Sequence, residues 1–180
     1  AELFKGYVAA VGSSLSVAIT LRKLTAGVTK TAKGKKLLLL NTLVGGSAGA
    51  CASFCNTYFM RMAETEKGID VFADEELTKK AGVSKVCAKS AVTETAWSRA
   101  AMSASSVSIP AILILALGAV GISPANKVFK NIVEINCVAT GLLIGLPFSV
   151  SIFPPVSIKN GKELETDFHS HDKIYFNKGL

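Results

Sequence analysis

Among the polar side chains in and beside the apolar stretches of this chain, uncharged amides and hydroxyls and two of the arginines could bind a small ligand. Asn56 and Asn136 lie inside charge-free stretches, and Arg61 and Arg99 stand at stretch edges. Amides donate and accept hydrogen bonds, and a guanidinium pairs with a carboxylate. These residue types predict binding of a small zwitterion. The alternative is that the amides join neighbouring helices and the arginines anchor at an interface.

Pro110 lies inside the third of the spans predicted below, at about 100–122, and Pro147 lies inside the fourth, at about 135–153. Each removes a backbone donor and crowds the preceding turn of a helix. Kinked helices of this kind occur around substrate paths, and they are also tolerated in inert bundles. The candidate substrate-binding residues are therefore Asn56, Arg61, Arg99, Pro110, Asn136 and Pro147.

Several kinds of chemistry are not expected. The four charge-free stretches hold no Asp, Glu, Lys, Arg or His, which argues against proton relay inside them. The cysteines form no CxxC pair, and His169 and His171 belong to a polar segment in which two exposed histidines are usually not a metal site, so no metal site is predicted. Hydrolase, phosphate-loop and dinucleotide motifs are absent from the sequence, which predicts neither an enzyme nor a cofactor.

The elements that must position these residues are long apolar helices. Charges are absent from residues 6–21, 37–60, 100–126 and 135–158. A helix needs roughly 20 apolar residues to cross a hydrocarbon core about 30 Å thick. Apolar residues make up 49% of the chain and charged residues only 18%, below the roughly 25% of soluble domains. We predict four transmembrane spans, at about 6–24, 37–60, 100–122 and 135–153.

The long connection between the second and third spans has a helical pattern of its own. Acidic residues begin it at Asp74, lysines follow, and Trp97 stands just before the third span. This order suits a helix dipole and an interfacial anchor, which predicts an amphipathic helix over about 74–98. A solvated connecting helix is the alternative. The expected fold is an all-α membrane protein, with a bundle over 1–158 and a polar tail over 159–180.

Charge placement predicts an orientation. The connections 22–36 and 127–134 together hold eight basic residues and one acidic residue. By the positive-inside rule both face the cytoplasm or its organellar equivalent. The formal net charge of +7 then reflects topology and attraction to anionic lipid at 22–36. Nucleic-acid binding is not expected, because basic residues are not interleaved with aromatic ones.

Small residues four apart predict close helix packing. Gly45 and Gly49 form such a pair in the second span, and Gly141 and Gly145 form another in the fourth. Membrane helices approach closely at such pairs, because lipid tails compete for larger apolar side chains. The two pairs favour a tight bundle or a partner helix.

A family resemblance emerges along nearly the whole chain. The final segment 174–180, Ile-Tyr-Phe-Asn-Lys-Gly-Leu, resembles the C-terminus of the sideroflexins, and 56–61 resembles their Asn-Ile-Pro-Leu-Met-Arg segment with Tyr58 in place of the proline. Further similar segments follow in the family's order, namely 68–71, Ser98-Arg99, Ile109-Pro110, Leu146-Pro147 and Phe153-Pro154.

The resemblance implies a carrier of neutral amino acids such as serine in the mitochondrial inner membrane. The basic connections 22–36 and 127–134 would then face the matrix, and the C-terminus would face the intermembrane space. The residue count around the spans predicts the same orientation independently.

Sideroflexins are longer, with an N-terminal matrix region and one more span before the point where this chain begins. If the chain is the whole mature protein, a shortened homologue is the alternative to a working carrier. Such a homologue is expected to serve as a structural accessory subunit of a respiratory-chain or ATP-synthase complex, a large mitochondrial membrane assembly.

Overall fold

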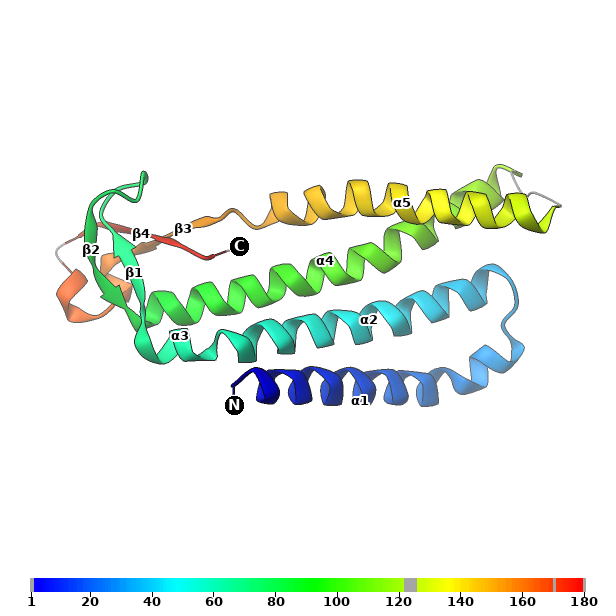
Figure 1. Ribbon diagram of the computed structural model, residues 1–180, viewed down its shortest axis with the longest axis horizontal. Coiled ribbons are helices and arrows are strands. Elements are labelled where there is room, and N and C mark those ends of the chain that lie inside the picture. Colours follow the sequence, from blue (N-terminus) through cyan, green and yellow to red (C-terminus); the bar gives the residue numbers. More distant parts are fainter. Residues whose placement is uncertain (1, 122–125, 170, 180) are drawn as a thin grey trace.

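The computed structural model describes residues 2–121, 126–169 and 171–179 as four long helices with a small sheet at one end (Figure 1). Successive long helices run in opposite directions and lie side by side. Their bounds are α1 Glu2–Thr31, α2 Lys35–Met60, α4 Lys85–Ala119 and α5 Lys127–Ile152.

The long helices pack as a row. α1 packs on α2, α2 packs on α4, and α4 packs on α5. Within the part of the chain that the structure describes, no other pair of these helices makes more than slight contact. The helices therefore form an open layer in which α4 lies between α2 and α5.

Three of the helices are long and apolar enough to cross a membrane, namely Lys35–Met60, Lys85–Ala119 and residues Val128–Phe148 of α5. The prediction of four spans is not confirmed for α1, whose charge-free stretch is the shortest of the four. The basic segment 22–36 is also less of a loop than expected. α1 continues to Thr31 and α2 begins at Lys35, so only 32–34 connects them.

The helix expected over 74–98 differs from the structure. Residues 74–79 form a turn in which the Asp74 carboxylate accepts hydrogen bonds from the amides of Thr78 and Lys79, at 3.0 and 2.9 Å. A strand follows, and helix begins only at Lys85. From there α4 runs unbroken into the third span, because no glycine or proline interrupts the chain before Pro110. The expected surface helix is the first part of a 35-residue helix.

The all-α prediction is wrong at the end of the layer, where a four-stranded antiparallel sheet forms. Its spatial order is β2-β1-β4-β3. The strands are β1 Ile69–Phe72, β2 Lys80–Ser84, β3 Val156–Asn160 and β4 Lys173–Asn177. The short helix α3, Met62–Lys67, joins α2 to β1. The segment 159–180, expected to be a polar tail, thus supplies β4 and part of β3.

A small hydrophobic core fixes the sheet to the start of α4. Ile174 and Phe176 alternate with exposed or half-buried residues along β4, as a strand with one buried face requires. They pack against Val71 of β1 and against Cys87 and Ala91 of α4. The 3₁₀ turns η1 (Gly161–Glu163) and η2 (Thr166–Phe168) lie between β3 and β4. Leu164 and Phe168 from this connection complete the core.

The first turn of α4 is capped from a distant part of the chain. Ser84 Oγ accepts from Cys87 N at 3.1 Å and donates to Glu165 Oε2 at 2.7 Å. Glu165 Oε1 accepts from the amides of Lys85 and Val86, so a carboxylate stands at the positive end of the helix. Partial burial would raise the pKa of Glu165, but hydrogen bonds, above all from Ser84, hold it below the usual value.

Arg61, which ends α2, joins three segments, and we call its contacts the Arg61 clamp. Its Nη1 donates to Thr95 Oγ1 of α4 at 3.0 Å and to the Lys178 carbonyl at 2.7 Å. Nε and Nη2 bind the Glu64 carboxylate at 3.0 and 2.7 Å. The guanidinium thereby sets the end of α2 against α4 and holds the C-terminal segment beside both.

Lys178 adds a second link between the C-terminal segment and α4. Its ammonium lies 2.6 Å from Glu94 Oε2, and its side chain is only 4% exposed. A lysine so deeply buried is stable only when paired. The next residue, Gly179, has a φ of 68° and lies against Arg61, so its lack of a side chain is needed for both reasons.

Three of the four glycines expected to pack helices lie against α4. A Cβ on Gly141 would stand 2.7 Å from Cγ and Cδ of Pro110, and one on Gly145 would stand 2.9 Å from Ile109 Cδ1. A Cβ on Gly49 of α2 would stand 2.9 Å from Ser103 Oγ. Gly45 is more distant, with Val107 at 4.0 Å. Glycine thus lets α4 approach both neighbours.

We predict that Gly141→Ala destabilises the protein while Gly27→Ala does not. The new methyl group at 141 collides with the Pro110 ring, and overpacking of this kind costs about 1–3 kcal/mol. Nothing lies within 4 Å of the matching position on Gly27, where alanine favours the helix. The free energy of unfolding in detergent measures both changes. Equal stability of the two variants would contradict the packing of α5 on α4.

We predict that Arg61→Gln loosens the C-terminal segment. Glutamine cannot replace the hydrogen bonds to Thr95, Lys178 and Glu64 together, and bonds to charged groups contribute about 1.5–3 kcal/mol. Hydrogen exchange at the amides of 174–178 should quicken about tenfold or more. Arg22→Gln, on the exposed surface of α1, is the control and should leave this exchange unchanged. Unchanged exchange in both variants would show that the clamp does not hold β4.

Candidate functional site

A polar groove lies where α2, α4 and α5 meet, near the sheet end of the layer. Its volume is about 530 Å³, within the range of roughly 300–1,000 Å³ typical of small-molecule sites. α5 contributes Leu142 and Leu146, and Met102 lies on α4. The polar lining comes from α2 and α4, and consists of Ser53, Asn56, Thr57, Arg99, Ser103 and Ser106.

Asn56 faces this groove with its amide available. It is exposed and makes no side-chain hydrogen bond with any residue that the structure describes. It also borders a second hollow of about 440 Å³ between α1 and α2, together with Tyr7 and Ser14. Asn56 can therefore meet a ligand from either hollow.

Arg99 is the cation of the groove. Its side chain is exposed, and its Nη1 lies 3.9 Å from Met102 Sδ. Arg99 has no ion pair with a described carboxylate, unlike Arg61, which binds Glu64. A guanidinium without a partner in the fold can form a charge-assisted hydrogen bond to a ligand carboxylate.

Aromatic side chains mark the level at which the groove begins. Trp97 of α4 is 58% exposed and packs on Phe54 of α2, with ring centroids 5.0 Å apart. Tyr58 stacks on the same Phe54 at 6.0 Å. Trp and Tyr concentrate at membrane–water interfaces. The groove therefore begins near the level of these aromatic rings and extends to Ser106, roughly 13 Å further along α4 from Trp97 at 1.5 Å per residue.

The structure brings Asn56 and Arg99 together and leaves the other candidate residues outside the groove. Arg61 is bound in the clamp. Pro110 is buried against Gly141. Asn136 is exposed and donates to the Ile132 carbonyl of its own helix at 2.9 Å. Pro147, on α5, is exposed and lines none of the hollows described here.

Sequence reasoning did not assign the serines of the groove to a site. Arg99, Ser103 and Ser106 recur at the three- and four-residue spacing of one helix face, as do Ser53 and Asn56. This periodicity was a usable signal, because the polar residues form a stripe on an otherwise apolar helix. The sequence does not say that the two stripes face the same hollow.

The lining suits a small zwitterion. Arg99 can bind a carboxylate, and the hydroxyl and amide oxygens of Ser53, Asn56 and Thr57 can accept from an ammonium. No described acidic residue lines the groove. Arg99 is therefore the charge that a cationic ligand would meet in the groove. Because the two charges have the same sign, binding of a cation is disfavoured.

Comparison with known proteins matches the whole chain to one family. The family model described as "Sideroflexins" covers residues 1–180. Human sideroflexin-5 is 30% identical over 184 residues, covering 99% of this chain and 53% of the relative. Sideroflexin FSF1 of Saccharomyces cerevisiae is 29% identical, over 99% and 56%. Sideroflexin-1 of Rattus norvegicus is 29% identical, over 99% and 55%.

The chain thus spans about half the length of the curated relatives it matches. No solved structure matches it. The residues of the predicted resemblance, from Asn56 in α2 to the terminal segment that forms β4, all lie within the matched range. The chain belongs to the sideroflexin family.

Proposed function

We propose that this chain is a non-enzymatic carrier of a small neutral amino acid such as serine, bound in the groove between α2, α4 and α5. The observation that carries the proposal is Arg99, a cation at the groove with no described carboxylate partner, beside the unbonded amide of Asn56. Arg99 would bind the carboxylate of the amino acid, and the neutral oxygens would bind its ammonium and hydroxyl groups.

The kind of ligand follows from charge. A zwitterion has no net charge, so its transfer needs no buried ionisable relay. The described parts of the spans carry hydroxyl and amide groups at the groove, and Arg99 lies at the interface level, where a charge is tolerated. This arrangement supports a neutral amino acid over an anion or a cation.

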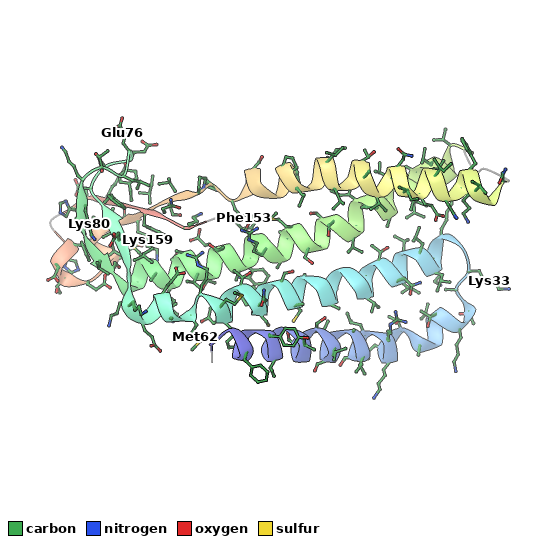
Figure 2. All side chains as sticks on the ribbon, in the orientation of Figure 1. Lys33, Met62, Glu76, Lys80, Phe153 and Lys159 are labelled. Carbon is green, nitrogen blue, oxygen red and sulfur yellow. The ribbon has the colours of Figure 1, made fainter. Side chains whose placement is uncertain are left out.

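The proposed location is the mitochondrial inner membrane, with the basic end in the matrix and the C-terminus in the intermembrane space. Lys33, Lys35, Lys36 and Lys130 lie at the end of the layer away from the sheet (Figure 2 labels Lys33). The positive-inside rule supports this orientation.

We predict that liposomes containing the chain take up labelled serine, and that Asn56→Leu or Arg99→Gln lowers uptake about tenfold or more, because hydrogen bonds to a charged group are lost. Asn136→Leu and Arg22→Gln are matched controls. They change the same residue types outside the groove and should retain most of the uptake.

Correct insertion is checked by protease protection of each variant. Absence of uptake by correctly inserted protein would contradict the proposed transport. An equal loss in Asn56→Leu and Asn136→Leu would place the site elsewhere.

The open layer favours a second candidate function, that of an accessory subunit in a respiratory-chain or ATP-synthase complex. Over the described residues α1 packs on α2 and makes no more than slight contact with α4 or α5, and large apolar side chains such as Leu15 and Leu24 are exposed on it. A row of helices that does not close into a bundle leaves its broad faces free to receive helices of another protein.

We predict for this second role that the chain co-migrates with a large assembly on native gels of mildly solubilised mitochondrial membranes. Its own mass is 18.8 kDa, so the two positions are well separated. Migration only as a small free species would exclude the subunit role. Serine uptake by the isolated chain would favour the carrier.

A further inference from the structure

A second hollow lies at the basic end of the layer, away from the groove. It has a volume of about 470 Å³ and is bounded by the start of α2, the end of α4 and the start of α5. Leu38, Ile114 and Val133 are among its apolar walls, and Lys35, Lys130 and Glu134 are its charged residues. The same helices form the groove at the other end, so the two hollows lie at opposite ends of one interface.

The two lysines come from different helices. The Lys35 stem passes along α4, since its Cε lies 3.9 Å from the place of a Cβ on Gly118. Lys130 lies 3.9 Å from Glu134, and both side chains of this pair are about half exposed. An exposed pair one turn apart contributes little to stability. Lys130 therefore remains available to a stronger anion.

Three features together indicate the occupant. Two lysines against one glutamate give the hollow a net positive charge. Its walls are apolar, so a freely soluble anion would leave them uncovered. It opens where three apolar helices begin or end, the level at which lipid headgroups lie. Basic pockets between transmembrane helices bind anionic lipid headgroups in other proteins.

We propose that an anionic phospholipid binds in this hollow. Its phosphate lies between Lys35 and Lys130, and one acyl chain lies along Leu38, Ile114 and Val133. The lipid fills the space between α2, α4 and α5 beyond the close contacts that Gly49 of α2 and Gly141 and Gly145 of α5 make with α4. This inference is independent of the proposed transport, because it uses none of the groove residues.

The experiment is a titration of the purified full chain in detergent with phosphatidylglycerol, followed by native mass spectrometry. Phosphatidylcholine and inorganic phosphate are the comparison ligands. We expect phosphatidylglycerol to bind more tightly than either. The double variant Lys35→Gln/Lys130→Gln should weaken its binding about thirtyfold, because the bound phosphate loses two charge-assisted contacts.

The matched control is Lys33→Gln/Lys36→Gln, which removes the same charge from the same end. Both lysines are exposed and outside the lining of the hollow, and Lys33 projects away from the helices (Figure 2). We expect this control to weaken binding less than threefold, because only the general attraction to anionic headgroups changes.

Equal weakening in the two double variants would overturn the site, since it would show only general attraction. Equal affinity for phosphatidylcholine or for inorganic phosphate would overturn the choice of lipid. If the first double variant does not fold, Lys35→Gln is compared with Lys36→Gln. A loss of about fivefold in the former alone supports the site, and equal affinities overturn it.

Discussion

The guanidinium of Arg61 is the contact on which the sheet end of this protein depends. It stands where α2 ends, and its hydrogen bonds reach Thr95 in the first third of α4 and the backbone of the C-terminal segment. Thr57 and Arg99 lie one helical turn further from the sheet, on α2 and α4 respectively. The contact between Arg61 and Thr95 therefore also brings these two groove residues to the same level along the helices. Because Arg61 is bound to Thr95, Lys178 and Glu64, Arg99 is the arginine of the groove that remains available to a ligand.

Close packing supplies the other constraint. In a bilayer, apolar side chains gain nothing by leaving lipid, so helices stay together through small residues and complementary shapes. Here Gly49 admits Ser103, and Gly141 admits the ring of Pro110. Pro110, which the sequence marks as a position where α4 can kink, also fills a space that Gly141 leaves open. α4 thus contacts both α2 and α5, while its polar residues Arg99, Ser103 and Ser106 still line the groove between the three helices.

The helices could be predicted because charge is absent over whole spans and returns at their edges, as between Met60 and Arg61. The sheet could not, because its strands have four or five residues and β1 pairs with β4, about a hundred residues later. The alternation of Ile174 and Phe176 was a visible strand pattern, but the surrounding charges favoured a tail. For the candidate site, the sequence predicted which types of side chain could bind a ligand. It did not predict which of these side chains lie next to one another in the folded chain. Asn56 and Asn136 look alike in sequence, and only the packing of α2 on α4 separates them.

The length of α4 determines how far this protein reaches into water. Its 35 residues rise roughly 52 Å at 1.5 Å per residue, whereas a hydrocarbon core is about 30 Å thick. The part from Trp97 to Ala119 rises roughly 33 Å, which matches that core. With Trp97 at the surface of a bilayer, the part before it would stand beyond the lipid, capped by Ser84 and Glu165 and packed against the sheet. The sheet lies along this part of α4, from the capped first turn down to Thr95 beside Lys178, so a soluble factor approaching from that side would meet the sheet within the roughly 18 Å that α4 rises above the aromatic level.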